Sequence, residues 1–153
     1  MPGTKATMKL KQLSVFLENR PGSLTLPARL LAQAGVNLVT LSLADTQQFG
    51  ILRLVVRDWD KARQILEAGG CVVKVTEVVA IEVTDRPGGL LEILEVLERG
   101  GVNVEYMYAF TAKKGNTAVL VFRSTDPDQA LRVLQAARIN VIDPVGDFQR
   151  LEG

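Results

Sequence analysis

A six-residue segment that occurs twice constrains this chain more than any other feature of its sequence. Asn19-Arg20-Pro21-Gly22-Ser23-Leu24 is matched by Asp85-Arg86-Pro87-Gly88-Gly89-Leu90, which begins 66 residues later (85 − 19). Gly35-Val36-Asn37 is matched by Gly101-Val102-Asn103 at the same spacing. Two matches in the same order indicate an internal repeat. We therefore predict two copies of one small domain, at residues 9–76 and 77–153, after a flexible leader at residues 1–8.

Each copy has the hydrophobic pattern of a β-α-β-β-α-β unit. In the first copy, the pattern predicts strands at 9–17, 36–44, 51–56 and 71–75, and helices at 24–34 and 58–69. In the second copy, it predicts strands at 78–83, 102–111, 117–122 and 141–142, and helices at 90–99 and 126–137. This order is that of the ferredoxin-like fold. We predict an α+β protein of two ferredoxin-like βαββαβ domains in tandem, each with an antiparallel sheet covered by both helices on one face.

Several local signals refine these elements. Asp58 is a candidate N-cap, and Asp126-Pro127 is a typical helix start. Pro27 would remove a backbone hydrogen bond if Ser23 capped the first helix, so we expect that helix to begin near Thr25. The predicted hairpin turns lie at 46–50 and 113–116.

Composition excludes several classes of protein. The 153-residue chain is 47% hydrophobic and 23% charged, and its net charge of +1 does not favour nucleic acid or an anionic membrane. No run approaches the roughly 18 apolar residues of a membrane span. Cys71 is the only cysteine, so no intrachain disulfide can form and a cytoplasmic location is expected. We therefore expect neither a nucleic-acid nor a membrane partner.

Catalytic, metal and cofactor sites are not indicated either. The chain has no histidine, which is the commonest general base, and one cysteine cannot form a multi-thiolate metal site. The predicted third strands lack the aromatic platform of RNA-recognition motifs. Tyr106, Tyr108 and Phe110 share one face of a predicted strand, where they fit a core, an interface or the wall of a pocket. We expect no catalysis, no cofactor and no metal.

The repeated segment has the chemistry of a ligand-binding loop. Proline fixes φ and the following glycine tolerates unusual backbone angles, so Arg-Pro-Gly predicts a sharp exit from the strand. The amides that begin the next helix suit a carboxylate or a phosphate. Asn19 and Asp85 could bond a ligand's amino group or close the turn. Asn37 and Asn103 offer a donor and an acceptor, but they also fit an ordinary turn between helix and strand.

The segment Leu17-Glu18-Asn19-Arg20-Pro21-Gly22-Ser23-Leu24, followed by Gln33-Ala34-Gly35-Val36-Asn37-Leu38, resembles an ACT domain. It is especially similar to the serine-sensing regulatory domain of phosphoglycerate dehydrogenase, and the resemblance extends from Met8 to about Phe148. It implies paired domains with small effectors, usually amino acids, bound at the pair interface next to the first loop. The two ligand-holding asparagines of the dehydrogenase fall on Asn19 and Asn37, and in the second copy on Asp85 and Asn103. A histidine of that domain is replaced here by Leu17 and Val83, so the resemblance does not fix serine as the ligand.

The sequence as a whole predicts a non-catalytic sensor of an amino acid or similar metabolite, in a homodimer and with a metabolic enzyme as a possible partner. The alternative is a regulatory subunit that acts on a partner enzyme, similar to the small subunit of acetohydroxyacid synthase. Because Asp85 favours an ammonium and opposes a carboxylate, we expect one competent site or two sites of unequal affinity. The predicted ligand-binding residues are Asn19, Arg20, Pro21, Gly22, Ser23, Leu24, Asn37, Asp85, Arg86, Pro87, Gly88, Gly89, Leu90 and Asn103.

Overall fold

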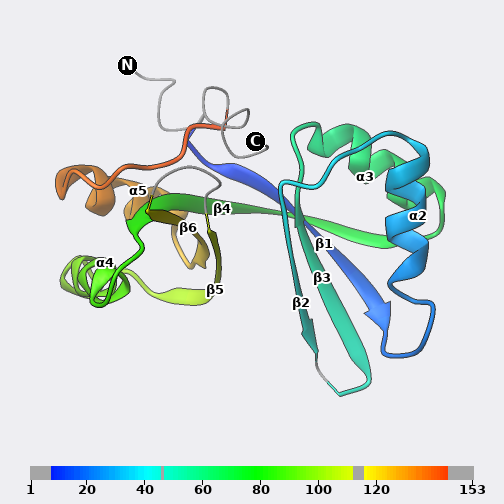
Figure 1. Ribbon diagram of the computed structural model, residues 1–153, viewed down its shortest axis with the longest axis horizontal. Coiled ribbons are helices and arrows are strands. Elements are labelled where there is room, and N and C mark those ends of the chain that lie inside the picture. Colours follow the sequence, from blue (N-terminus) through cyan, green and yellow to red (C-terminus); the bar gives the residue numbers. More distant parts are fainter. Residues whose placement is uncertain (1–7, 46, 112–115, 145–153) are drawn as a thin grey trace. The chain divides into compact units, whose positions relative to one another are not determined.

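The computed structural model describes residues 8–45, 47–111 and 116–144 (Figure 1). The chain divides into two compact units. Lys11–Thr76 form the first unit, and the described residues from Glu77 onward form the second together with Met8–Leu10. Residues 1–7 of the predicted leader, Thr46 and Lys113–Gly115 lie outside the described residues, so the structure does not test the predictions made for them.

The first unit is a helix-covered sheet. It contains β1 (Leu10–Glu18), α2 (Thr25–Gln33), β2 (Thr40–Asp45), β3 (Phe49–Val55), α3 (Trp59–Ala68) and the beginning of β4 (Val72–Thr84). The strand order runs β2-β3-β1, with antiparallel pairing of β3 to both neighbours. Helices α2 and α3 lie on the same face of these strands (Figure 1). Their inner side chains enclose a core of Leu13, Val15, Leu31, Leu52, Leu54, Val56, Ala62 and Leu66.

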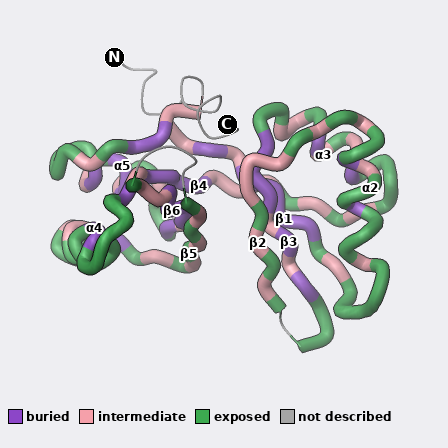
Figure 2. The backbone as a smooth tube through the Cα atoms, in the orientation of Figure 1, coloured by how far each residue is buried: buried purple, intermediate pink, exposed green. Residues whose placement is uncertain are grey.

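The second unit repeats this plan. The rest of β4 is followed by α4 (Gly89–Arg99), β5 (Val104–Thr111), β6 (Thr117–Ser124) and α5 (Pro127–Ala136). The order is β4-β6-β5, again with antiparallel pairs. The predicted last strand is reduced to a single bridge between Val141 and Ile81. The buried tube segments of Figure 2 include β4 and β6, in agreement with a core whose strand residues are Val79, Ile81, Val83, Leu120 and Phe122.

This architecture confirms the prediction of two ferredoxin-like domains in tandem, but several strands differ from their predicted bounds, most clearly β2 and β4. The predicted strands 71–75 and 78–83 are one continuous strand, β4, because Thr76-Glu77 contains no turn-forming residue that would interrupt it. The strand predicted from Val36 begins only at Thr40. Val36 and Leu38 are half-buried against the core, but they are not part of a strand. The alternation of apolar residues at these positions therefore reflects packing against the core and not pairing within the sheet.

The helix starts follow the sequence signals closely. The carboxylate of Asp58 accepts a hydrogen bond from the Lys61 amide at 3.3 Å, and that of Asp126 accepts one from the Gln129 amide at 3.2 Å. Helix α2 begins at Thr25, as Pro27 predicted. Pro27 is then the third helical residue, where an amide would have no intrahelical partner. The cap position is held by Leu24 without a side-chain bond, so Ser23 is not the cap.

Strand register reveals a two-residue shift between the copies. Leu17 on β1 lies opposite Gly50 on β3, and its equivalent Val83 on β4 lies opposite Ala118 on β6. The offset is therefore 66 residues for the first pair member (83 − 17) and 68 for the second (118 − 50). The β5–β6 hairpin is longer than the β2–β3 hairpin by these two residues, and every later element is related by the larger offset.

Candidate ligand-binding pockets

The repeated loops fold into the same turn in both units. The Arg20 carbonyl accepts a hydrogen bond from the Ser23 amide at 3.3 Å, and the Arg86 carbonyl accepts one from the Gly89 amide at 3.0 Å. Gly22 has φ +90° and Gly88 has φ +88°. Proline at the second position and a positive-φ glycine at the third define a type II turn. The predicted sharp exit from the strand is confirmed, and its glycine is explained by the backbone angle.

Each loop is attached to the neighbouring hairpin of its own unit. The Asn19 amide donates to the Gln48 carbonyl at 3.0 Å, and the Asp85 amide donates to the Asn116 carbonyl at 2.8 Å. The side chains at these positions behave differently. Asn19 Nδ2 donates to the Gln47 carbonyl at 3.0 Å, whereas Asp85 makes no side-chain hydrogen bond or ion pair with any described residue. Asn19 therefore closes its turn, and Asp85 keeps its carboxylate available.

The loop arginines are both paired, but with different partners. Arg20 Nε lies 3.1 Å from Glu18 Oε2 on β1. Arg86 Nη2 lies 2.6 Å from Glu92 Oε1 in the first turn of α4, and its Nη1 donates to the Pro87 carbonyl at 3.3 Å. In the second unit the guanidinium charge is therefore largely balanced by Glu92.

The two helices begin at different points after the repeated motif. Helix α4 begins at Gly89, whereas α2 begins two residues later than the equivalent position, Ser23. A Cβ atom at Gly89 would collide with the Thr84 carbonyl oxygen. The absence of a side chain at Gly89 thus permits this early helix start, close to the end of β4.

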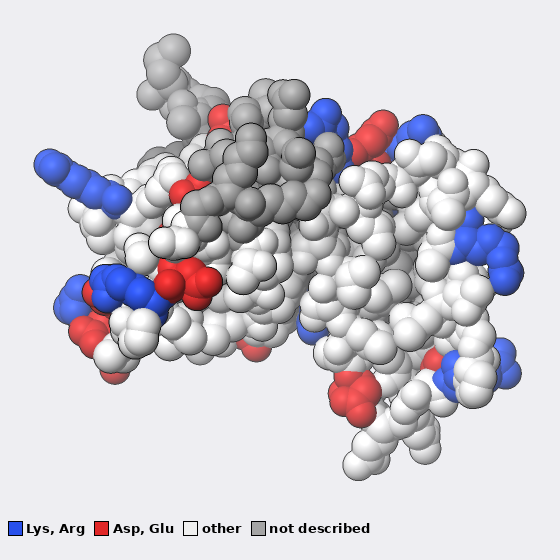
Figure 3. All heavy atoms as spheres, viewed as in Figure 1, with Lys and Arg blue, Asp and Glu red and all other residues white. Residues whose placement is uncertain are grey.

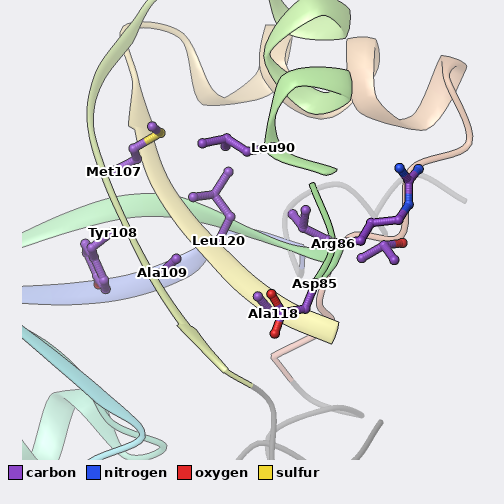
Figure 4. A pocket seen from close by; sticks show the side chains of 10 residues that line it. Asp85, Arg86, Leu90, Met107, Tyr108, Ala109, Ala118 and Leu120 are labelled. Atoms are coloured by element: carbon purple, nitrogen blue, oxygen red, sulfur yellow. The ribbon is translucent and has the colours of Figure 1, made fainter. Parts of the chain in front are cut away.

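A pocket of about 290 Å³ lies beside the second loop (Figure 4). In the close-up, Leu90 of α4 and Leu120 of β6 point toward each other, and Asp85 lies near Ala118. Most of the wall is apolar, and the polar residues gather at the loop. The lining residues are Val83, Thr84, Asp85, Arg86, Leu90, Met107, Tyr108, Ala109, Ala118 and Leu120.

The first unit has a smaller pocket of about 80 Å³ at the equivalent place. It too is formed by the end of the first strand, the repeated loop, the helix start and the edge strand. Its lining residues are Leu17, Glu18, Asn19, Arg20, Ser23, Leu24, Leu43, Asp45 and Gly50.

The structure brings together some of the predicted site residues and separates others. Those that line a pocket are Asn19, Arg20, Ser23 and Leu24 in the first unit, and Asp85, Arg86 and Leu90 in the second. Pro21, Gly22, Pro87, Gly88 and Gly89 belong to the turns and do not line either pocket.

Asn37 and Asn103 lie away from the loop pockets of their own units. Asn103 Nδ2 donates to Thr125 Oγ1 at 3.0 Å, near the beginning of β5, whereas the pocket adjoins the second half of that strand. Four residues of extended chain separate Asn103 from Met107, the first pocket residue on β5, and this corresponds to about 13 Å.

Sequence reasoning missed the strand residues that form most of the second pocket. Met107 and Ala109 lie opposite Phe122 and Leu120, on the face of the sheet that carries the helices. The aromatic stripe occupies the other face, and of its three members only Tyr108 lines the pocket. The alternation of Met107 and Ala109 with the neighbouring aromatic residues was the available sequence signal. Which face of the sheet each set occupies depends on the register of β5 with β6.

The charge distribution gives no sign of a single-sign binding surface on the face shown in Figure 3, where acidic and basic side chains intermingle. Among the described residues, no cluster of three or more His, Cys, Asp or Glu side chains could hold a metal ion. Burial raises the pKa of the Cys71 thiol. None of the helices within the described ranges has the length and apolarity needed to cross a membrane.

The chain matches the family model of the ACT domain pair over residues 8–147. It therefore belongs to the ACT domain pair family, and this membership supports a regulatory, ligand-binding role. The solved structure of protein BT0572 from Bacteroides thetaiotaomicron is 37% identical, with a TM-score of 0.86 over 93% of this chain and 97% of that one.

Two further solved structures share the fold at low identity. The ligand-free regulatory subunit of aspartate kinase from Thermus thermophilus is 14% identical, with a TM-score of 0.60 over 85% of this chain and 93% of that one. The corresponding subunit from Thermus flavus is 16% identical, with a TM-score of 0.57 and the same coverage. Comparison with curated protein sequences gives no significant match.

Proposed function

We propose that the chain is a non-catalytic, cytoplasmic sensor that binds an amino acid or similar small metabolite beside its repeated loops, at the interface of paired ACT domains. One observation carries this proposal. The same type II turn closes a pocket at the same place in both units. A turn needed only to connect a strand to a helix would not have to adjoin a pocket each time.

The second pocket supplies the groups that an amino acid requires. The first-turn amides of a helix and the positive end of its dipole attract a carboxylate, and α4 begins at Gly89 beside the pocket residue Leu90. The Asp85 carboxylate suits an ammonium. A zwitterion can satisfy both if its carboxylate faces the helix and its ammonium faces Asp85.

We also propose that the protein forms a homodimer. Strands β2 and β5 end the strand order among the described residues, and Leu41 and Leu43 on β2 are 56% and 52% exposed. Pairing with another domain would cover these side chains and the strand edge. Pairing would also allow Asn37 or Asn103 of one domain to approach a loop of another. Sedimentation equilibrium should give twice the chain mass, and a monomer at every concentration would contradict this assembly.

A partner-binding regulatory subunit is the second candidate function. The fold is the one used by the regulatory subunits of Thermus aspartate kinase, and the segment at residues 13–19 resembles the start of the acetohydroxyacid synthase small subunit. Stable co-purification with a large metabolic enzyme, combined with an effect on its rate, would favour this candidate over a freestanding sensor.

Thermal-shift screening of the whole chain against all the amino acids tests the proposed sensor. A ligand at ten times its dissociation constant stabilises the folded state by about 1.4 kcal/mol, which gives a measurable rise in Tm. Asn103→Ala should then weaken binding of the active compound without a loss of helical circular dichroism. An unchanged affinity would remove Asn103 from the site, and a screen without any shift would contradict the sensor function.

A further inference from the structure

The two pockets differ in size, and one exchange on the edge strand accompanies this difference. Leu43 on β2 is replaced by Ala109 on β5, where each residue lies opposite a leucine of the next strand. The Leu43 Cδ1 atom lies only 3.4 Å from the place that a Cβ atom on Gly50 would occupy, so its side chain packs over Gly50, and both residues line the first pocket. With alanine at position 109, the second pocket remains open at about 290 Å³, compared with about 80 Å³ in the first.

The open space is apolar at one end. Leu90, Met107, Ala109 and Leu120 form that end, and Leu90 and Met107 are 44% and 42% exposed. A guest with an apolar side chain would remove this surface from water, which contributes about 0.8 kcal/mol for each methylene group buried. A small polar guest such as serine would leave the same surface uncovered.

Among the described residues, the other end of the pocket carries a net negative charge. The Arg86 guanidinium is balanced by Glu92 at 2.6 Å, and Figure 4 shows this arginine extending away from Leu90 and Met107. The Asp85 carboxylate has no charged partner among the described residues. In the first unit the corresponding residue is the neutral Asn19, whose amide is already bonded to Gln47.

Resting on the sensor function proposed above, we infer that the second pocket selects an ammonium-bearing ligand with a large apolar side chain, the class to which leucine and phenylalanine belong. The ammonium binds Asp85, and the side chain lies between Leu90, Met107 and Leu120. The small side chain of Ala109 leaves space for the apolar side chain of the ligand. In the first pocket the larger side chain of the equivalent Leu43 excludes ligands of this class.

Isothermal titration calorimetry of the full chain with leucine, phenylalanine, serine, isoamylamine and 4-methylpentanoate tests this inference. Leucine or phenylalanine should bind at least about tenfold more tightly than serine, since three additional buried carbons are worth more than that factor. Isoamylamine, which keeps the ammonium, should bind detectably, whereas 4-methylpentanoate, which lacks it, should not.

Two variants locate the effect. Ala109→Leu should abolish binding by filling the pocket, while the same exchange at the exposed helical position 136, Ala136→Leu, should leave it unchanged. Asp85→Asn should weaken binding of the amine about tenfold or more. Tighter binding of serine, or an unchanged affinity in Ala109→Leu, would overturn this inference and leave the sensor function standing. If no amino acid bound, the result would contradict both this inference and the sensor function.

Discussion

At the scale of single residues, the two units have different side chains at one equivalent buried position. Val56 and Ser124 are equivalent under the 68-residue offset, and both are almost completely buried. Val56 completes the core of the first unit. The Ser124 hydroxyl has no hydrogen-bond partner among the described residues. A buried hydroxyl without a partner costs about 1–3 kcal/mol, so Ser124 is a weak point of the second unit.

We predict that Ser124→Ala raises the free energy of unfolding by about 1 kcal/mol, because it removes the unsatisfied hydroxyl and leaves only a small void. The reciprocal change Val56→Ser should lower it by about 2 kcal/mol or more, since it loses apolar contacts and buries a hydroxyl. Urea denaturation of both variants measures the difference. A destabilised Ser124→Ala protein would show that the hydroxyl is satisfied.

A second pair of residues differs in backbone strain. Gly70 and Arg138 both follow the second helix of their unit and have φ +91° and +59°. Each amide closes the helix end with a hydrogen bond of 3.0 Å, to Glu67 and Gln135 respectively. Glycine adopts this left-handed conformation freely, whereas arginine does so at a cost of about 1 kcal/mol.

Arg138→Gly should therefore stabilise the protein by about 0.5–1 kcal/mol, and Gly70→Ala should destabilise it by a similar amount. Nothing lies within 4 Å of a Cβ atom at Gly70, so this second change tests the backbone angle without a steric clash. Thermal unfolding followed by circular dichroism compares the two variants. Equal Tm values for all three proteins would mean that neither position is strained.

At the scale of elements, the start of α4 depends on the close approach of Gly89 to β4. Gly89→Ala should destabilise the second unit by about 2 kcal/mol, because the new Cβ atom meets a backbone carbonyl that cannot rotate away. The matched control is Ser23→Ala, at the equivalent position of a helix that begins two residues later, and it should change Tm little. Hydrogen exchange of the α4 amides would show whether the helix start has shifted in the glycine variant. Unaltered stability and exchange would contradict the proposed role of Gly89.

The accuracy of the sequence predictions followed the kind of signal each element carries. Asp58, Asp126 and Pro27 are local signals, and the helices that they mark begin where expected. The start of β2 was predicted wrongly because alternating apolar residues report burial, and burial does not require a sheet partner. The pocket wall could not be predicted, since Met107 and Ala109 are placed beside the loop by the pairing of β5 with β6, which the order of residues along the strand does not reveal.

At the scale of the whole molecule, the second unit includes residues that precede the first unit in the sequence. Lys9 Nζ lies 3.1 Å from Asp128 Oδ1 on α5 and 3.5 Å from Glu77 Oε2 on β4. The hydrogen bond to Asp128 is the main reason why the pKa of Lys9 is raised above its ordinary value of 10.5, and the charge of Glu77 adds to it. The segment before β1 is thus held to the second unit by one cation between two carboxylates.

Replacing this cation should change stability in a pH-dependent way. Because the folded state holds the Lys9 proton more tightly than the unfolded state, its contribution is complete below pH 10.5 and is lost as the pH rises through the folded-state pKa. Lys9→Met should cost less than about 1 kcal/mol at neutral pH, since both carboxylates are partly exposed. The difference from the unaltered chain should shrink above pH 10.5 in denaturation experiments. If the stability difference between the two proteins stayed constant across this pH range, the loss would come from the packing of the Lys9 side chain and not from its charge.

The proposed function requires a ligand site beside the repeated loop in each unit, with the larger site in the second unit. An NMR titration of the isotope-labelled full chain with pooled amino acids tests this requirement, since it reports both binding and position. We predict that amide shifts concentrate in residues 83–90 and 107–109, with weaker changes in residues 17–24. The absence of shifts with every amino acid, or shifts confined to residues far from both loops, would contradict a ligand site at these loops.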